Sequence, residues 1–174
     1  MKKIILSSII LIFLITGIGF AFQNEPDGFR GLKWGDAPTE DMYFSSQAIS
    51  KYDIHKGNYY YRKSDKLKIG SAELVSIKYL FNLYSNQFYK VWGMFYSETN
   101  YDILKIIFEE KFGLPTKLKN KKYPLFWNGD KTKIQLFFYP DKNAGIFTII
   151  NREIHSEEPE DNKQKEAEKA KEDF

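Results

Sequence analysis

Few residues in this chain have a type and spacing that suit catalysis. The two histidines, His55 and His155, are far apart, and His55 has a carboxylate two residues away, that of Asp53. Such a pair binds a metal or shares a proton only if a distant residue completes the site. The sequence contains neither a His-Glu-x-x-His nor a Gly-x-Ser-x-Gly motif. We therefore interpret both histidines as surface residues and predict no metal site.

Glu109 and Glu110 are the one adjacent pair of carboxylates inside an expected helix or strand. Glycoside hydrolysis needs two carboxylates that flank the scissile bond, whereas consecutive helical residues do not face each other. A solvated helix face explains the pair better, so no catalytic residue and no cofactor are predicted. A cell-wall or polysaccharide hydrolase remains an alternative. Cysteine is absent, which excludes disulfides, thiolate metal sites and a lipid-modified cysteine.

Aromatic residues interleaved with lysines form the strongest indication of a binding site. On one face of the expected sheet they are Trp92, Lys78, Lys90, Phe88, Tyr96, Phe137 and Tyr139, with Phe126 and Lys133 beside them. Single-stranded nucleic acid is held on such faces by stacking and charge, but the export expected from residues 1–21 argues against this ligand. The same face suits sugar rings or a protein partner. It is alternatively covered by residues 43–58, by the C-terminal tail or by another subunit.

This face belongs to a hairpin in the stretch from Glu73 to Gly113, around which the rest of the chain is organised. A five-residue loop over residues 83–87 makes one strand face apolar and the other mixed. The pairs expected on the apolar face are Val75 with Phe95, Ile77 with Gly93, Tyr79 with Val91 and Phe81 with Tyr89. The pairs expected on the mixed face are Leu74 with Tyr96, Ser76 with Met94, Lys78 with Trp92 and Leu80 with Lys90.

A helix from about Tyr101 to Phe112 should cover the apolar face. Thr99 or Asn100 can cap its start, and Gly113 followed by Pro115 ends it. The apolar stripe at helical spacing comprises Tyr101, Leu104, Ile107, Phe108 and Phe112.

Further hairpins extend the sheet. We expect a short strand over residues 29–35, a hairpin of Tyr59–Arg62 with Leu67–Ile69, and another around Asn128-Gly129. A last strand from Ala144 to about Ile154 should place Phe138 opposite Gly145, Leu136 opposite Phe147 and Ile134 opposite Ile149. The fold class is therefore α+β, an antiparallel sheet of consecutive hairpins with one main helix on one face.

The chain divides into four parts. Residues 1–21 have a positive start, an apolar run and small residues at the end, as in a signal peptide cleaved after Ala21. The alternative is an uncleaved anchor in the inner membrane, which would be the chain's one membrane contact. Residues 22–28 should be a linker, residues 29–155 one domain, and residues 156–174 a charged tail that is disordered or a frayed helix.

The opening from Phe29 to Gly35 resembles a group of uncharacterised exported bacterial proteins with an F-x-G-[IL]-x-W-G start. The resemblance extends through the tyrosine-rich run, Asp65-Lys66-Leu67-Lys68-Ile69-Gly70 and the helix end Glu110-Lys111-Phe112-Gly113. It covers most of residues 29–154 and implies no known activity. More distantly, the order of elements is similar to small envelope domains of the outer-membrane barrel-assembly lipoprotein and β-lactamase-inhibitor type.

The chain departs from that second type because it lacks a lipobox cysteine and has at most one helical turn in place of two N-terminal helices. This resemblance implies the fold alone. Taken together, the sequence predicts a periplasmic or secreted, non-catalytic binding module. Its partner would be an envelope protein or a glycan, and an envelope-assembly factor is a further alternative.

Overall fold

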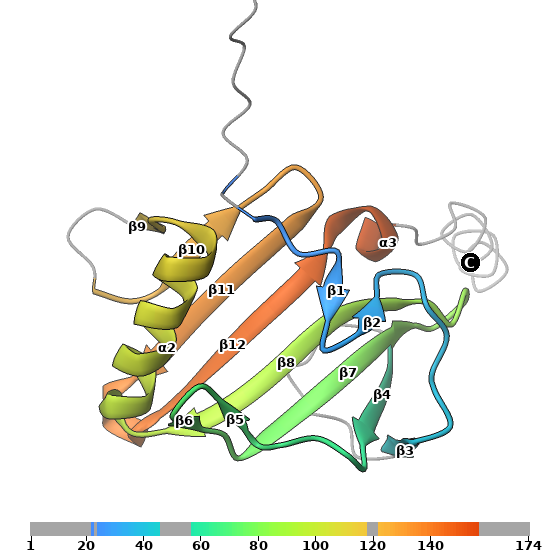
Figure 1. Ribbon diagram of the computed structural model, residues 1–174, viewed down its shortest axis with the longest axis horizontal. Coiled ribbons are helices and arrows are strands. Elements are labelled where there is room, and N and C mark those ends of the chain that lie inside the picture. The colour runs from blue at the N-terminus through green and yellow to red at the C-terminus, as the bar shows by residue number, and fades with distance from the viewer. Residues whose placement is uncertain (1–21, 23, 46–56, 118–121, 157–174) are drawn as a thin grey trace, which may run out of the picture.

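Eight strands form one antiparallel sheet in the part of the chain that the computed structural model describes, namely residues 22, 24–45, 57–117 and 122–156 (Figure 1). The strands follow the spatial order β3-β4-β7-β8-β12-β11-β10-β9. Their bounds are β3 Met42–Ser45, β4 Gly57–Arg62, β7 Ser76–Asn82, β8 Phe88–Tyr96, β9 Thr116–Lys117, β10 Leu125–Asn128, β11 Thr132–Tyr139 and β12 Ala144–Asn151. The predicted α+β class, with one main helix, is confirmed.

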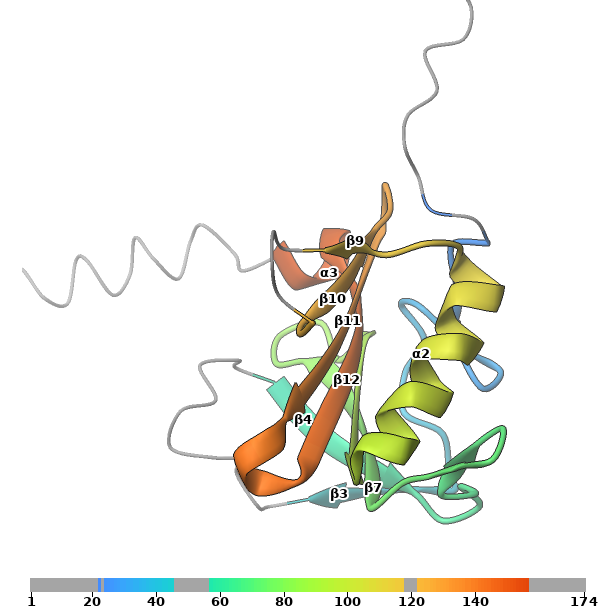
Figure 2. The same cartoon turned by 90° about the vertical axis from the view of Figure 1, so that its left-hand side faces the viewer.

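The main helix, α2 (Glu98–Phe112), crosses one face of this sheet, which we call the inner face (Figure 2). Ser97 caps the helix by accepting the amide of Asn100, and Gly113 ends it at a φ of 81°. The predicted stripe is largely buried against the sheet, at Tyr101, Leu104, Phe108 and Phe112. The predicted caps Thr99 and Asn100 were wrong, since the helix begins at Glu98.

Two short ribbons stand on the inner face beside α2 (Figure 1). They are β1 (Gly28–Phe29) with β2 (Leu32–Lys33), and β5 (Lys68–Ile69) with β6 (Ala72–Glu73). The first turn places Arg30 at φ 51° and Gly31 at φ 81°, a left-handed pair in which glycine is favoured. The glycine of the opening motif thus lets the ribbon reverse, so that Leu32 is buried and Trp34 packs on the core.

The central hairpin has the predicted register over most of its length. Lys78 pairs with Trp92 and Ile77 with Gly93, but a bulge then makes Phe81 pair with Phe88 rather than with Tyr89. The extra residue turns Phe88 to the inner face and Tyr89 to the outer one. Val75, expected in the core, lies before β7 and is 42% exposed.

The predictions for the other hairpins were partly correct. The Asn128-Gly129 hairpin and the pairing of Ile134 with Ile149 are confirmed. The predicted hairpin of residues 59–62 with 67–69 was wrong, because β4 pairs with β3 and β7 and β5 pairs with β6. The last strand ends at Asn151, a short 3-10 turn (Pro140–Lys142) precedes it, and a short helix, α3 (Arg152–Ser156), follows it.

Residues expected to form a linker contact the domain. The Glu25 carboxylate accepts backbone amides of Asp130, Lys131 and Thr132 in the β10–β11 turn, and Phe22 packs edge-on against Phe112 with centroids 5.7 Å apart. Gly28 already belongs to β1. The expected signal segment, Asp53, His55 and the tail from residue 157 lie outside the described residues. No helix within the described ranges is long and apolar enough to span a membrane.

Candidate functional site

The outer face of three neighbouring strands, β8, β12 and β11, presents a regular group of side chains that we call the outer array. Cross-strand pairing aligns it in three rows of three. The rows are Tyr96-Ala144-Tyr139, Met94-Ile146-Phe137 and Trp92-Thr148-Gln135. Side chains two residues apart on a strand point to the same face, so the array is a direct product of the register.

Tyr96 and Tyr139 form the most open row of the array. They are 53% and 43% exposed, and the residue between them is Ala144, whose side chain is a single methyl group. Strands lie roughly 4.8 Å apart, so the two backbones that carry the rings are about 10 Å apart. The Tyr139 ring is nearly parallel to that of Phe137, with centroids 6.4 Å apart.

The opposite row carries the polar groups of the array. The Thr148 hydroxyl donates to the Gln135 side-chain oxygen at 3.0 Å, beside the partly buried ring of Trp92. Lys78 extends its ammonium over Trp92 at 5.3 Å from the centroid and over Tyr61 at 5.6 Å. Lys78 is only 9% exposed and lies against two rings. Its ammonium therefore holds the Trp92 ring in position and is largely shielded from solvent.

A second group of residues closes one end of the outer face. Tyr59, Leu80 and Tyr89 are buried together with partly buried Ile154 of α3, and the His155 ring lies 5.6 Å from that of Tyr89. Figure 2 shows α3 on the opposite side of the sheet from α2. The array is therefore bounded by packed side chains at its Trp92 end and open at its Tyr96 end.

Cations lie along the β11 side of the array. The Lys133 ammonium lies 5.4 Å from the Phe126 ring centroid, and that of Lys142 lies 5.8 Å from the Tyr139 centroid. The Phe126 and Phe137 rings meet edge to face at 6.1 Å. The array thus continues onto β10 as an aromatic surface with positive charge at its margin.

The predicted site residues fall into three groups. Trp92, Tyr96, Phe137 and Tyr139 belong to the array. Lys78 and Lys90 lie on the same face but are covered, with Lys90 4% exposed. Phe88 is a correction: the bulge places it in the core, stacked on Trp34, so it cannot touch a ligand on the outer face.

Sequence reasoning missed the contribution of the central strand, Ala144 and Ile146 above all. The alternation of Ala144, Ile146 and Thr148 with the buried Gly145, Phe147 and Ile149 was the available signal. It missed as well that Tyr61, stacked on Tyr43 with centroids 5.5 Å apart, continues the Trp92 row beyond Lys78. Glu109 and Glu110 lie on α2, across the sheet from the array.

Comparison of the chain with family models, with curated proteins and with solved structures finds no match.

Proposed function

We propose that this chain is a non-catalytic, exported binding module that holds a glycan strand on the outer array. The observation that carries the proposal is the row Tyr96-Ala144-Tyr139, two exposed rings on either side of a small residue. An aromatic ring offers a flat apolar surface for the C–H face of a sugar, and the phenol adds a hydrogen bond at its edge. The Thr148 and Gln135 side chains supply further hydrogen-bonding groups within the same array.

The size of the array favours a slender ligand over a globular partner. The three strands of the array at roughly 4.8 Å and five residues at roughly 3.4 Å give a platform of about 10 by 14 Å, and Phe126 and Tyr61 extend it across neighbouring strands as a narrow band. A stable protein interface buries about 800 Å² on each partner, several times that area. An extended chain of sugar rings uses a narrow platform well, because each ring needs one aromatic contact and a few hydrogen bonds.

Export is supported by the sequence of residues 1–21, which has the form of a signal peptide. In the cell envelope a glycan is the abundant polymer that presents apolar ring faces together with hydroxyl groups. The absence of cysteine from the whole chain suits an envelope protein that folds without disulfides.

The proposal is tested by incubating the mature protein, residues 22–174, with purified insoluble cell-wall glycan and measuring the bound fraction. Cross-linking in cells, followed by identification of the captured molecules, is carried out in parallel. Retention on glycan without any protein supports the proposal. Capture of one membrane protein together with no retention on glycan would instead identify an envelope-assembly factor. Release of soluble sugars that stops on neutralising Glu109, Glu110 or Asp53 would identify a hydrolase.

A further inference from the structure

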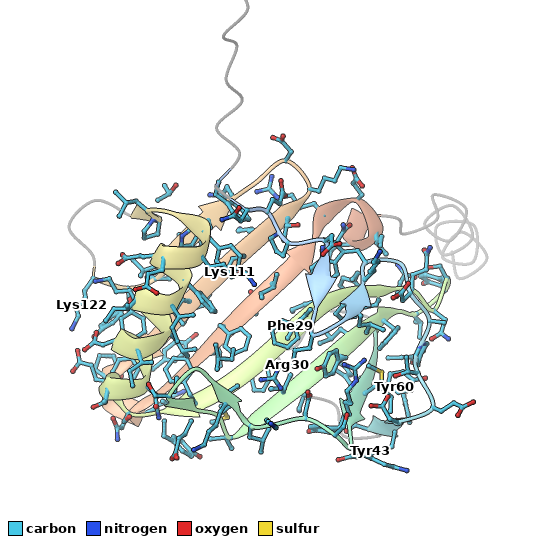
Figure 3. All side chains as sticks on the ribbon, viewed as in Figure 1. Phe29, Arg30, Tyr43, Tyr60, Lys111 and Lys122 are labelled. Carbon is cyan, nitrogen blue, oxygen red and sulfur yellow. The ribbon has the colours of Figure 1, made fainter. Side chains whose placement is uncertain are left out.

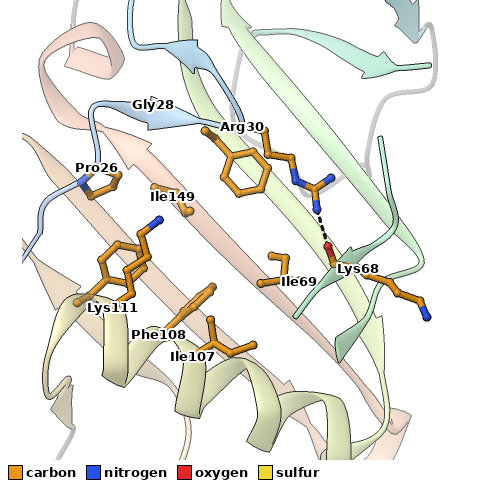
Figure 4. Close-up of a pocket in the computed structure, with 11 residues that line it drawn as sticks. Pro26, Gly28, Arg30, Lys68, Ile69, Ile107, Phe108, Lys111 and Ile149 are labelled. Atoms are coloured by element: carbon orange, nitrogen blue, oxygen red, sulfur yellow. Dashed lines mark hydrogen bonds between the residues drawn. The ribbon is translucent and has the colours of Figure 1, made fainter. Parts of the chain in front are cut away.

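A cavity of about 410 Å³ lies on the inner face of the sheet, between α2 and the two ribbons (Figure 4). This volume is within the range of small-molecule pockets, roughly 300 to 1,000 Å³. Its lining comes from parts of the chain that are far apart in the sequence: Pro26 with residues 28–30, residues 68–69, residues 107–108 with 111–112, and Ile149. The cavity is separate from the outer array, because the sheet itself lies between them.

The walls of the cavity are apolar. Phe108 and Ile149 form buried surface on the helix and the sheet, and Phe29, Ile69 and Ile107 are partly buried around them. The charged residues of the lining are Arg30, Lys68 and Lys111, all of them cations. A pocket with apolar walls and exclusively positive charge suits a molecule with an apolar body and an anionic end.

Arg30 connects the two ribbons by hydrogen bonds. Its guanidinium donates to Asp65 at 2.9 Å and to the backbone oxygens of Lys66 and Lys68 at 2.8 and 2.6 Å. These bonds join the β1–β2 turn to β5, so the two ribbons form one wall opposite α2. Because three of its five N–H donors already have partners, and one of these is the Asp65 carboxylate, Arg30 maintains the width of the cavity and is a weaker candidate for binding an anion.

Lys111 is the cation best placed to bind an anion. Lys68 lies 3.5 Å from the Glu73 carboxylate and points away from the cavity (Figure 4), whereas Lys111 has no carboxylate partner among the described residues. Figure 3 shows Lys111 on α2, on the opposite side of the inner face from Phe29 and Arg30. Its ammonium lies 5.5 Å from the Phe112 ring centroid, at the margin of the apolar lining.

We propose that this cavity binds a single-chain amphiphile with an anionic head, of the fatty-acid class. The acyl chain lies between Phe29, Ile107 and Phe108, and the carboxylate meets the Lys111 ammonium at the mouth. A neutral or cationic amphiphile would leave Lys111 without a partner, so the site should discriminate by the charge of the head group.

The test is isothermal titration of the mature protein with dodecanoate below its micelle concentration. Dodecanol and dodecyltrimethylammonium serve as ligands with the same chain and a different head. We expect saturable binding of dodecanoate with one site per chain. Lys111→Met should weaken the affinity for dodecanoate about tenfold, as expected for the loss of one charge-assisted hydrogen bond. The affinity for dodecanol should be unchanged. The matched control is Lys105→Met. Lys105 lies on the same helix, but it pairs with Glu109.

A second pair of variants tests the cavity itself. Ile107→Trp places a large ring in the cavity and should abolish binding, whereas Ile106→Trp, at a neighbouring position that is 55% exposed, should not. Thermal unfolding of each variant establishes that it is folded. Absence of saturable dodecanoate binding would overturn the proposal, as would equal affinities in the wild type, Lys111→Met and Ile107→Trp. Tyr96→Ala should leave dodecanoate binding intact, which separates this site from the outer array.

Discussion

The rings of Trp34 and Phe88 stack with centroids 4.8 Å apart, on the opposite face of the sheet from the next residue in the chain, Tyr89. Phe88 thus packs in the core on the inner face and Tyr89 in the buried cluster on the outer face, because the bulge at this point pairs Phe81 with Phe88. The backbone amide of Gly35 donates to the Phe88 carbonyl at 2.9 Å, which fixes the segment after the first ribbon to the edge of this bulge.

Replacing Phe88 by alanine should destabilise the fold strongly. The side chain is fully buried and contacts Trp34, Tyr79 and Phe81, so its removal leaves a cavity among aromatic rings. We expect a loss of about 3–5 kcal/mol in the free energy of unfolding, measured by urea denaturation. Tyr84→Ala, at an exposed residue of the β7–β8 loop, is the control and should change that free energy by less than about 0.5 kcal/mol. Similar stability of the two variants would mean that Phe88 lies on the surface.

Replacing Glu25 by glutamine should loosen the N-terminal segment. The Glu25 carboxylate accepts the amides of Asp130 at 3.1 Å and of Lys131 at 2.7 Å, and that of Thr132 as well. An amide side chain keeps the shape but loses the charge, so we expect a loss of about 1–3 kcal/mol in the free energy of unfolding. Hydrogen exchange at residues 130–132 should become faster in the same variant.

Asp27→Asn is the matched control for Glu25→Gln. It removes an exposed carboxylate two residues away, and its backbone carbonyl still accepts the Trp34 amide at 2.9 Å. Unchanged exchange in both variants would show that the Glu25 contact does not hold the turn.

Tyr79 should make the stability of the protein sensitive to alkaline pH. Burial, together with the neighbouring Asp65 that accepts its hydroxyl at 3.0 Å, raises the pKa of Tyr79 above its ordinary value of 10.0. A raised pKa in the folded state contributes stability that is complete below the unfolded value and is lost as the pH rises above it. The advantage of the wild type over Tyr79→Phe should therefore shrink progressively as the pH rises from about 9 to about 11.5, without reaching its lower limit there.

The measurement for Tyr79 is the difference in free energy of unfolding between wild type and variant at several pH values. Burial raises the pKa of Tyr101 too, but Tyr101 is present in both proteins and so cancels in the difference. A difference that stays constant across this range would contradict the assignment.

Local features of the fold could be predicted from the sequence. The pairing of Lys78 with Trp92 followed from the expected loop over residues 83–87, and the end of α2 followed from Gly113, which has a positive φ of 81°. The prediction from alternation failed near the turn because Phe88 and Tyr89 are both large and aromatic. The sequence therefore does not indicate which of the two faces the core. The Asn82 side chain accepts the amides of Tyr84 and Ser85, which tightens the loop next to the bulge.

Non-local features could not be predicted in the same way. Tyr59, Tyr60 and Tyr61 suit both faces of a sheet. The sequence therefore does not indicate that β4 pairs with β7 instead of forming a hairpin with β5. The inner cavity joins segments around residues 29, 69, 107 and 149 that share no periodicity. The predicted aromatic face followed from alternation in two hairpins that were assumed to share one sheet, whereas its central strand required β12 to lie between β8 and β11.

The most direct test of the proposed function is titration of the mature protein with soluble cell-wall oligosaccharides. The readouts are heat and the fluorescence of Trp92, the partly buried tryptophan of the outer array. The variants are Tyr96→Ala and Tyr139→Ala, alone and combined, with Tyr84→Ala as the control because it removes an equally exposed tyrosine away from the array. We expect each array variant to weaken binding about tenfold and the combined variant to abolish it, with thermal unfolding unchanged. Oligosaccharide affinity that is equal in the combined variant, Tyr84→Ala and the wild type would contradict the account.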